Sequence, residues 1–376
     1  MKQTIKFKTR ELEKSIGKAA MFCGISKLMP ILDTILVEIK DGKMSMTSSN
    51  TDSYITATVN SVSAAQDCSF CVNGKDVERA VQLISDEFTD LVVDTDNNQM
   101  EIAHSHGWLA FTTYDSSEFP MYNNSGESVK FEIGSQMFQY ILSVSRNFLG
   151  NDVLRPVMTG VYIHAHNGVV EFCATNASTL ITDTVLADIP SEIDTDMIIG
   201  GNVTRAVMEI ISGSDIVTVE NFDNVAVFRC GDSYAAIRKI EGKFPNYKVI
   251  VPSAEDQSYD KYAIVNIKEL LSSAKRCSIS CASSNLLKIV LTGDKMKVQS
   301  ENIDFGKKTV EDVDFVDAKG EIEFGINMAY LNTCINVFDG DNVKIKMALP
   351  NKAILFYDEN NANPYRTILS MPMMIN

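Results

Sequence analysis

The chain has 376 residues, of which 45% are hydrophobic and 22% are charged, and its formal net charge at pH 7 is −15. This composition is typical of a globular protein of two or three domains. It contains no run of about 18 apolar residues that could span a membrane. The first ten residues alternate basic and apolar side chains, so we expect no signal peptide. A strong negative charge, taken alone, argues against a nucleic-acid partner.

The first third of the chain predicts strands around two helices. Thr9 is expected to cap a helix from Arg10 to Phe22, and Asn73 a second helix that ends near Ser85. Asp41-Gly42 predicts a two-residue hairpin turn. Runs rich in β-branched residues predict strands at 1–7, 31–39, 44–47, 54–59, 69–72, 91–93, 100–103 and 108–112.

The remaining two thirds repeat this pattern. Helices are predicted at 135–148, 203–212, 267–277 and 327–338, and hairpin turns at Asn167-Gly168 and Gly293-Asp294. The elements between them read as strands. Each third therefore combines two helices with several strands.

Repeated residues keep one spacing along the chain. Phe119-Pro120 returns as Phe244-Pro245, which is 125 residues later, and Arg79-Ala80-Val81 returns as Arg205-Ala206-Val207, which is 126 residues later. A third X-Pro pair, Met371-Pro372, follows at a similar distance. Such a period indicates repeated structural units. We therefore predict an α+β fold of three repeated domains, at 1–125, 126–253 and 254–376, each with two helices packed on antiparallel sheets.

Positive charge concentrates in the predicted helices. The six windows 5–18, 74–84, 135–148, 202–212, 266–277 and 326–338 together carry +6, so the rest of the chain carries −21. Basic helical faces on an acidic body give a field of two signs, which restores nucleic acid as a possible partner. The alternative is that solvated helix faces simply contain a few more lysines.

Three segments resemble one family. They are Pro30-Ile31-Leu32, the run from Glu241 to Tyr247 and the ending Met371-Pro372-Met373. Together with the three-unit period, they resemble the beta sliding clamp of bacterial DNA polymerase III over the whole chain. The resemblance implies the DNA clamp fold and a homodimer that closes head to tail into a ring around double-stranded DNA. It implies a processivity factor that tethers the replicative polymerase and repair proteins to the duplex, without sequence preference and without a catalytic site or cofactor.

The resemblance implies cations that face the hole of the ring. A closed ring holds DNA by topology, so it needs fewer phosphate contacts than an open groove does. The implied DNA-facing residues are Arg10, Lys14, Lys27, Lys75, Arg79, Arg146, Arg155, Arg205, Lys275 and Arg276.

A second implied site takes short linear peptides from the polymerase alpha subunit, the clamp loader and repair proteins. Its matching positions are Met158, Thr175, Ala177, Ser178, Thr179, Leu180, Pro245, Val249, Ile250, Leu369, Ser370, Met371, Pro372 and Met373. The family usually has Asp-Gly-His-Arg-Leu at 176–180, where this chain has Asn-Ala-Ser-Thr-Leu, and Arg where Val249 and Met374 stand. The altered donors predict a changed peptide preference, as in a phage, plasmid or diverged clamp.

The third implied surface is the dimer interface. By position, Leu109 and Phe111 should meet the helix end around Ile279 of the other subunit. Pairing there would cover a strand edge that otherwise invites aggregation.

Chemistry-bearing motifs are sparse. His104-x-His106 and His164-x-His166 each place two imidazoles on one strand face, but without a third ligand that recurs with them, so we predict no metal site. The eight cysteines share no spacing across the repeats, which favours a reducing cytoplasm over a disulfide framework. Two alternatives remain at this point: a three-domain interaction scaffold that never closes, and a metal-dependent hydrolase that uses the His-x-His pairs.

Overall fold

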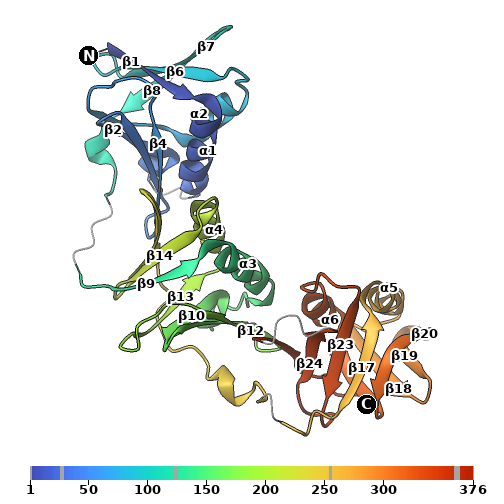
Figure 1. Cartoon of the computed structure of the whole chain (residues 1–376). Coiled ribbons are helices and arrows are strands. Elements are labelled where there is room, and N and C mark those ends of the chain that lie inside the picture. The colour runs from blue at the N-terminus through green and yellow to red at the C-terminus, as the bar shows by residue number, and fades with distance from the viewer. Residues whose placement is uncertain (1, 26–28, 122–125, 254–255, 360–364, 376) are drawn as a thin grey trace. The chain divides into compact units, whose positions relative to one another are not determined.

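The computed structural model describes residues 2–25, 29–121, 126–253, 256–359 and 365–375 (Figure 1). The chain forms two compact units. Unit 1 comprises Met1–Tyr140 and Ala187–Lys239, and unit 2 comprises Ile141–Leu186 and Ile240–Asn376. Within the described ranges, no helix has both the length and the apolar character needed to cross a bilayer.

Unit 1 is built on one long antiparallel sheet of twelve strands. Its order is β1 (Lys2–Lys8), β6 (Phe88–Asp94), β7 (Gln99–His104), β8 (Gly107–Tyr114), β5 (Cys68–Asn73), β2 (Thr34–Lys40), β3 (Lys43–Ser49), β4 (Tyr54–Asn60), β16 (Ser233–Arg238), β15 (Val225–Cys230), β14 (Ile216–Asn221) and β9 (Val129–Gly134). A further strand of this unit is β13 (Asp194–Gly200). The β4–β16 pairing joins the first and second predicted repeats into one sheet.

Unit 2 contains two groups of antiparallel strands. The first runs β10 (Gly160–His166), β11 (Val169–Thr175), β12 (Thr179–Leu186), β25 (Arg366–Ser370), β24 (Ile354–Asp358), β23 (Asn342–Met347), β17 (Lys261–Asn266) and β21 (Phe315–Lys319). The second is a four-stranded sheet, β20 (Lys307–Val313), β19 (Lys295–Asn302), β18 (Leu286–Thr292) and β22 (Ile322–Asn327). The β12–β25 pairing joins the second and third predicted repeats.

Two α-helices fall in each predicted repeat of the described chain. They are α1 (Thr9–Ala19), α2 (Gly74–Gln82), α3 (Ser135–Ser145), α4 (Thr204–Ile211), α5 (Ile267–Ser278) and α6 (Met328–Ile335). Short 3-10 turns are η1 (Ala20–Phe22), η2 (Pro30–Asp33), η3 (Ser116–Glu118), η4 (Arg146–Phe148), η5 (Pro156–Thr159), η6 (Tyr247–Val249) and η7 (Ile303–Phe305). In unit 1, α1 packs on β3 and β4, and α4 packs on β15 and β16. These elements confirm the predicted α+β class.

The start of α1 differs from the prediction. Thr9 is the first helical residue, not the cap, and the N-cap is Lys8 without a side-chain hydrogen bond. The reason is that β1 pairs with β6 up to Lys8, so the strand continues directly into the helix. Thr9 is buried instead, and its hydroxyl shares a hydrogen bond of 2.8 Å with Thr89.

Other local signals are confirmed. Asn73 caps α2 by accepting a hydrogen bond from the Asp76 amide at 3.0 Å, although this helix ends at Gln82 rather than near Ser85. Asp41 and Gly42 have φ of 49° and 75°, the left-handed pair that a two-residue hairpin requires. Asn167 and Gly168 repeat this conformation with φ of 43° and 79°.

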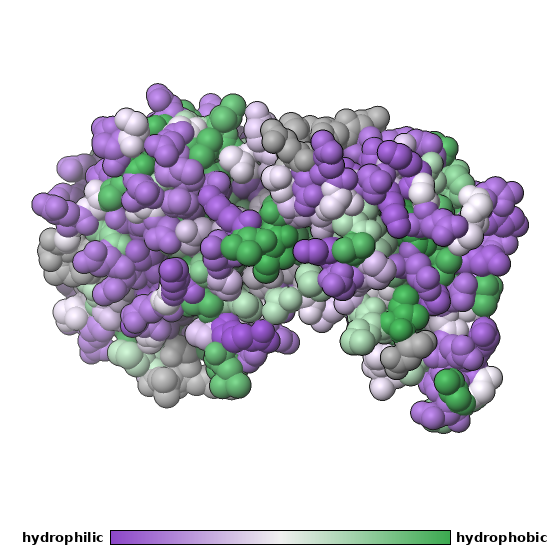
Figure 2. All heavy atoms as spheres, turned by 90° about the horizontal axis from the view of Figure 1, so that it is seen from below, coloured by the Kyte–Doolittle hydropathy of each residue, from purple (hydrophilic) through white to green (hydrophobic). Residues whose placement is uncertain are grey.

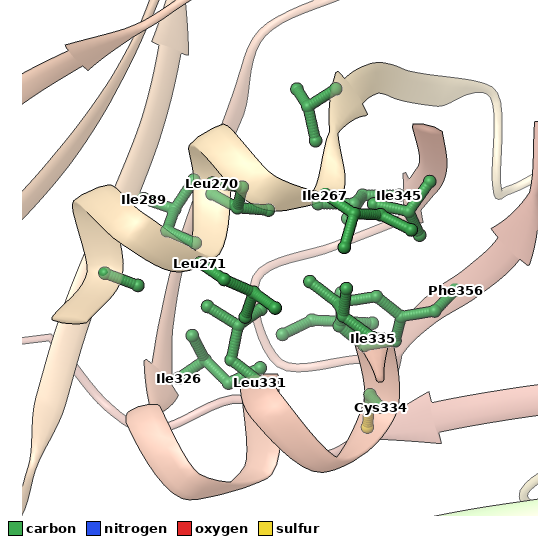
Figure 3. Packing of buried hydrophobic residues seen from close by; sticks show 14 of the residues in the cluster. Ile267, Leu270, Leu271, Ile289, Ile326, Leu331, Cys334, Ile335, Ile345 and Phe356 are labelled. Carbon is green, nitrogen blue, oxygen red and sulfur yellow. The ribbon is translucent and has the colours of Figure 1, made fainter. Parts of the chain in front are cut away.

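The core of unit 2 lies between its helices and strands (Figure 3). Leu270 and Leu271 of α5, Leu331 of α6, Ile345 of β23 and Phe356 of β24 belong to one buried cluster. Figure 3 shows Leu271 and Leu331 facing each other between the two helices. Burying each such side chain contributes about 1.5–3 kcal/mol. On the face drawn in Figure 2, hydrophilic side chains predominate and hydrophobic ones form small separate groups. Each helix thus has one buried apolar face and one face left for other contacts.

Candidate functional site

Three helices of unit 1 surround one cleft. α1 contacts both α2 and α4, and the cleft between them has a volume of about 1030 Å³. Lys14 and Lys18 of α1, Lys75 of α2 and Arg205 of α4 all line it. Glu11, Glu78 and Glu209 lie among them, so the cleft is mildly rather than strongly basic. An anion that enters it would meet cations from three helices.

Two lysines in the cleft are already engaged. Lys75 Nζ lies 2.9 Å from Glu78 Oε2. Lys18 Nζ donates to the Ser212 carbonyl at 3.2 Å, and burial lowers the pKa of Lys18, with Glu209 opposing the shift. Sequence reasoning left Lys18 out of the DNA-facing set. Its charge counted toward the helical window, but only the packing of α4 on α1 places it in the cleft.

The other predicted DNA-facing cations divide into paired and unpaired groups. Arg276 forms a two-pronged ion pair with Glu311, at 2.7 Å for Nε–Oε1 and 2.6 Å for Nη2–Oε2, and Arg155 Nε lies 2.9 Å from Asp152 Oδ2. Lys27 lies outside the described residues. Ion pairs with other described residues are absent for Arg10, Lys14, Arg79, Arg146, Arg205 and Lys275. The unpaired cations have the most charge to offer a phosphate.

Several of the predicted peptide-binding residues lie on two neighbouring strands of unit 2, β12 and β25. Thr179 pairs with Ser370 and Leu180 with Leu369 in the β12–β25 ladder. The chain then continues as a strap, because the Met371 amide donates to the Ser178 carbonyl and the Met373 amide to the Gly325 carbonyl, both at 2.8 Å. Thr175, Thr179, Leu180, Leu369 and Ser370 are buried, whereas Met371 remains partly exposed. The exposed edge of this group is apolar and rich in methionine.

The turn between β11 and β12 has a strained backbone. Ala177 has φ of 75°, in the left-handed region that favours glycine. Asn176 holds the turn with its side-chain oxygen, which accepts from the Ser178 and Thr179 amides at 2.9 and 2.7 Å. The glycine expected here from the resemblance is therefore a conformational requirement that this chain meets with alanine.

The segment after Phe244 packs on the neighbouring strands. Phe244 stacks on Tyr162 with ring centroids 4.8 Å apart, and the Tyr247 hydroxyl donates to Glu171 at 3.1 Å. Pro245 therefore lies in a segment whose two flanking aromatic residues, Phe244 and Tyr247, are both anchored. Val249 and Ile250 follow in η6 and just beyond it, and both are exposed.

Two of the open strand edges in the described structure lie at or beside the predicted dimer residues. β8 pairs with β7 along its length but with β5 only at Thr113 and Tyr114, so the other edge of 107–112 has no partner among described residues. Leu109 and Phe111 lie on this edge strand, together with Trp108, which is 63% exposed. In unit 2, Ile279 is exposed at the end of α5, beside the edge strand β20. Sequence reasoning missed Trp108 and β20, because strand order decides which strand is an edge.

The two His-x-His pairs have different surroundings. His104 and His106 flank a hairpin turn with ring centroids 6.4 Å apart. His164 and His166 lie beside Glu171, and these three form the one group of at least three potential metal ligands found among the described residues. The sequence pattern offered no third ligand that recurs with the pairs, but the structure places Glu171 beside His164 and His166. Glu171 comes from the paired strand β11, and only the register reveals it.

Comparisons with known proteins agree over nearly the whole chain. A family model described as DNA polymerase III beta subunit, N-terminal domain, matches residues 1–123, and one described as the C-terminal domain of the same subunit matches residues 253–373. Proteins named beta sliding clamp from Pseudomonas aeruginosa and Escherichia coli K12 are each 19% identical, over 91% and 92% of this chain and 92% and 93% of their own. A solved sliding clamp from P. aeruginosa, bound to griselimycin, superposes with a TM-score of 0.90 at 18% identity and 99% coverage of both chains. A DNA polymerase III beta subunit from Thermotoga maritima gives 0.88 at 18% identity and full coverage of both chains, so the predicted clamp fold is confirmed.

The strain at Ala177 gives a test of the turn. Ala177→Gly should raise the free energy of unfolding by about 1 kcal/mol, because glycine adopts a positive φ without the steric cost that alanine incurs. Urea unfolding followed by circular dichroism measures it. Ala174→Gly, in the adjacent strand, should lower stability by about 1 kcal/mol and serves as the control. Equal losses in both variants would contradict the strain.

Proposed function

Because the chain belongs to the DNA polymerase III beta subunit family, the beta sliding clamps, we propose that it closes into a ring around duplex DNA and tethers the replicative polymerase to it. The family is an accessory subunit of a polymerase holoenzyme and not an enzyme in its own right. The observation that carries the proposal is the placement of unpaired cations on helices of an otherwise acidic chain. Lys14 and Arg205 meet at one cleft in unit 1, and Lys275 lies on α5 in unit 2.

A modest positive field suits a ring better than a groove. An open groove holds DNA through many phosphate contacts, and its affinity falls steeply with salt. Three of the predicted DNA-facing cations already form ion pairs with carboxylates of their own chain: Lys75, Arg155 and Arg276. The remaining unpaired cations can keep a duplex near the centre of the ring without binding it tightly at one position. Sliding along DNA requires this weak binding.

The ring needs three domains in each chain and two chains. The proposed domains are 1–125, 126–253 and 254–376. The N-terminal family model ends at residue 123 and the C-terminal family model begins at residue 253, so each lies within two residues of a proposed domain boundary. For closure, the open edge of β8 with Leu109 and Phe111 would meet the end of α5 at Ile279 of a second copy. A contact between two different surfaces forms a closed ring when the rotation that relates one subunit to the next returns to the first subunit.

Partner proteins would dock on the strap and on the turn beside it. Short linear peptides from the polymerase alpha subunit, the clamp loader and repair proteins fit a site of this kind, and flexible methionines adapt to varied ligands. Val249 and the Ser178-Thr179 pair replace donors that the family usually has, so peptide preference should differ from that of its relatives. We place this activity in the cytoplasm.

The alternatives are less well supported. The hydrolase reading receives no support from the relatives, which are named beta sliding clamp. The open scaffold differs from the ring in its oligomeric state and in how DNA is held.

The helix cations give a test on linear duplex at low salt. In the double variant Lys14→Glu, Arg205→Glu, affinity should fall less steeply with salt. The slope of log affinity against log salt should become less negative by about 2, because each lost phosphate contact removes about one unit. Fluorescence anisotropy of a labelled short duplex measures it. Lys297→Glu with Lys319→Glu changes net charge equally but on strands, and should leave the slope unchanged. The same loss in both variants would assign the effect to net charge and contradict a DNA-facing role for the helices.

The strap gives a second test. Met371→Ala should weaken binding of a peptide from the polymerase alpha subunit about tenfold, because truncation removes about 1.4 kcal/mol of apolar burial. Isothermal titration calorimetry measures the affinity. Met137→Ala on α3 removes a methionine of similar exposure, 46% against 38%, and should have no effect. Unchanged affinity in Met371→Ala would place the peptide elsewhere.

A further inference from the structure

A cross-strand cluster in unit 2 has the composition of a metal site. His164 and His166 stand two residues apart on β10 and so share one face of the strand. In the antiparallel register His164 lies directly opposite Glu171 of β11. The β10–β11 hairpin turns tightly at Asn167-Gly168, which fixes this register. Backbone pairing therefore places two imidazoles and one carboxylate together without help from flexible loops.

The distances within the cluster match a tetrahedral cation. Glu171 Oε2 lies 3.6 Å from His164 Nδ1 and 3.4 Å from His166 Nε2, and the potential ligand atoms of the three residues all lie within 4.8 Å of one another. Zinc binds imidazole nitrogen and carboxylate oxygen at about 2.0–2.2 Å, so neighbouring ligand atoms of a tetrahedral site lie about 3.3–3.6 Å apart. Both measured pairs fall in this range. Small side-chain adjustments would suffice to hold an ion.

One ligand atom lacks a partner. His166 Nε2 is buried and makes no hydrogen bond in the described structure, although it lies near Glu171. A buried polar atom without a partner destabilises the folded chain. A cation would satisfy it. The two imidazole rings, with centroids 4.2 Å apart, leave their nitrogens close to the same carboxylate oxygen.

Lys248 now supplies the positive charge at this carboxylate. Its Nζ lies 2.6 Å from Glu171 Oε2, and the side chain is 54% exposed, so it can leave toward solvent. The Tyr247 hydroxyl also donates to Glu171 Oε2, at 3.1 Å. A divalent cation would therefore compete with Lys248 and Tyr247 for this oxygen.

We propose that His164, His166 and Glu171 form a binding site for a divalent cation of the zinc class, with a fourth position open to water. Two nitrogen donors with one oxygen donor favour Zn²⁺ over Mg²⁺ and Ca²⁺, which prefer oxygen ligands. The site is independent of the ring proposal, because it needs neither DNA nor a partner chain. Loading it would release Lys248 from Glu171.

Calorimetric titration of Zn²⁺ into the full chain tests the site. We expect one equivalent bound and no comparable heat with Mg²⁺. His164→Gln with His166→Gln should weaken binding at least about 100-fold, since even loss of a ligand's hydrogen-bonding neighbour costs 10- to 100-fold. Lys248→Ala should strengthen binding severalfold by removing the competing charge. His104→Gln with His106→Gln is the matched control and should bind as the unmodified chain does.

Cobalt distinguishes this site from the free cysteines, three of which are partly exposed. Co²⁺ bound at His164, His166 and Glu171 should absorb in the visible range without a thiolate charge-transfer band. Glu171→Gln provides a second variant if the double histidine variant unfolds, as judged by circular dichroism. A thiolate band, unchanged Zn²⁺ affinity in a folded Glu171→Gln or double histidine variant, or no Zn²⁺ uptake at all would each overturn the proposal.

Discussion

The burial of one apolar face of each helix decides where the positive charge of this chain can lie. In α1, Leu12 and Ile16 are buried, so Arg10 and Lys14 remain on the exposed side. In α5, Leu270, Leu271 and Ala274 are buried, which leaves Lys275 outside. The chain outside the six helical windows carries a net charge of −21, which is spread over strands and loops. Hydrophobic packing thus separates the two signs of charge before any partner is present.

The same packing limits how strongly the helices can hold DNA. Cations at helix surfaces have acidic neighbours one turn away, as with Lys75 and Glu78, or across an adjoining strand, as with Arg276 and Glu311. A binder that depended on adhesion would lose affinity through each of these pairs. A ring does not depend on adhesion, because a closed ring cannot leave the duplex sideways. The positive field of the helices then needs only to keep the duplex near the centre of the ring. The family membership and the weak field therefore support the same mode of action.

Signals that depend on neighbours in the sequence could be predicted, and those that depend on register could not. Asp41-Gly42 determines its own turn, and Asn73 caps α2 three residues away. Glu171, by contrast, reaches His164 only through the β10–β11 ladder, and Glu311 reaches Arg276 from a strand 35 residues distant. Thr9 has the composition of a cap, but the continuous β1–β6 pairing buries it. The clamp fold could be predicted from the family resemblance of three segments spread along the chain, whereas individual site residues require tertiary contacts.

Retention on nicked circular DNA is the most direct measurement of encirclement. The chain would be loaded with a clamp loader and ATP, separated by gel filtration at moderate salt, and counted on the circle before and after one restriction cut. Encirclement predicts stable retention on the circle and loss within seconds to minutes after linearisation, with no retention for a Leu109→Asp, Phe111→Asp variant that cannot close. Equal retention on circular and linear DNA would show that the protein adheres to DNA, and would contradict the account.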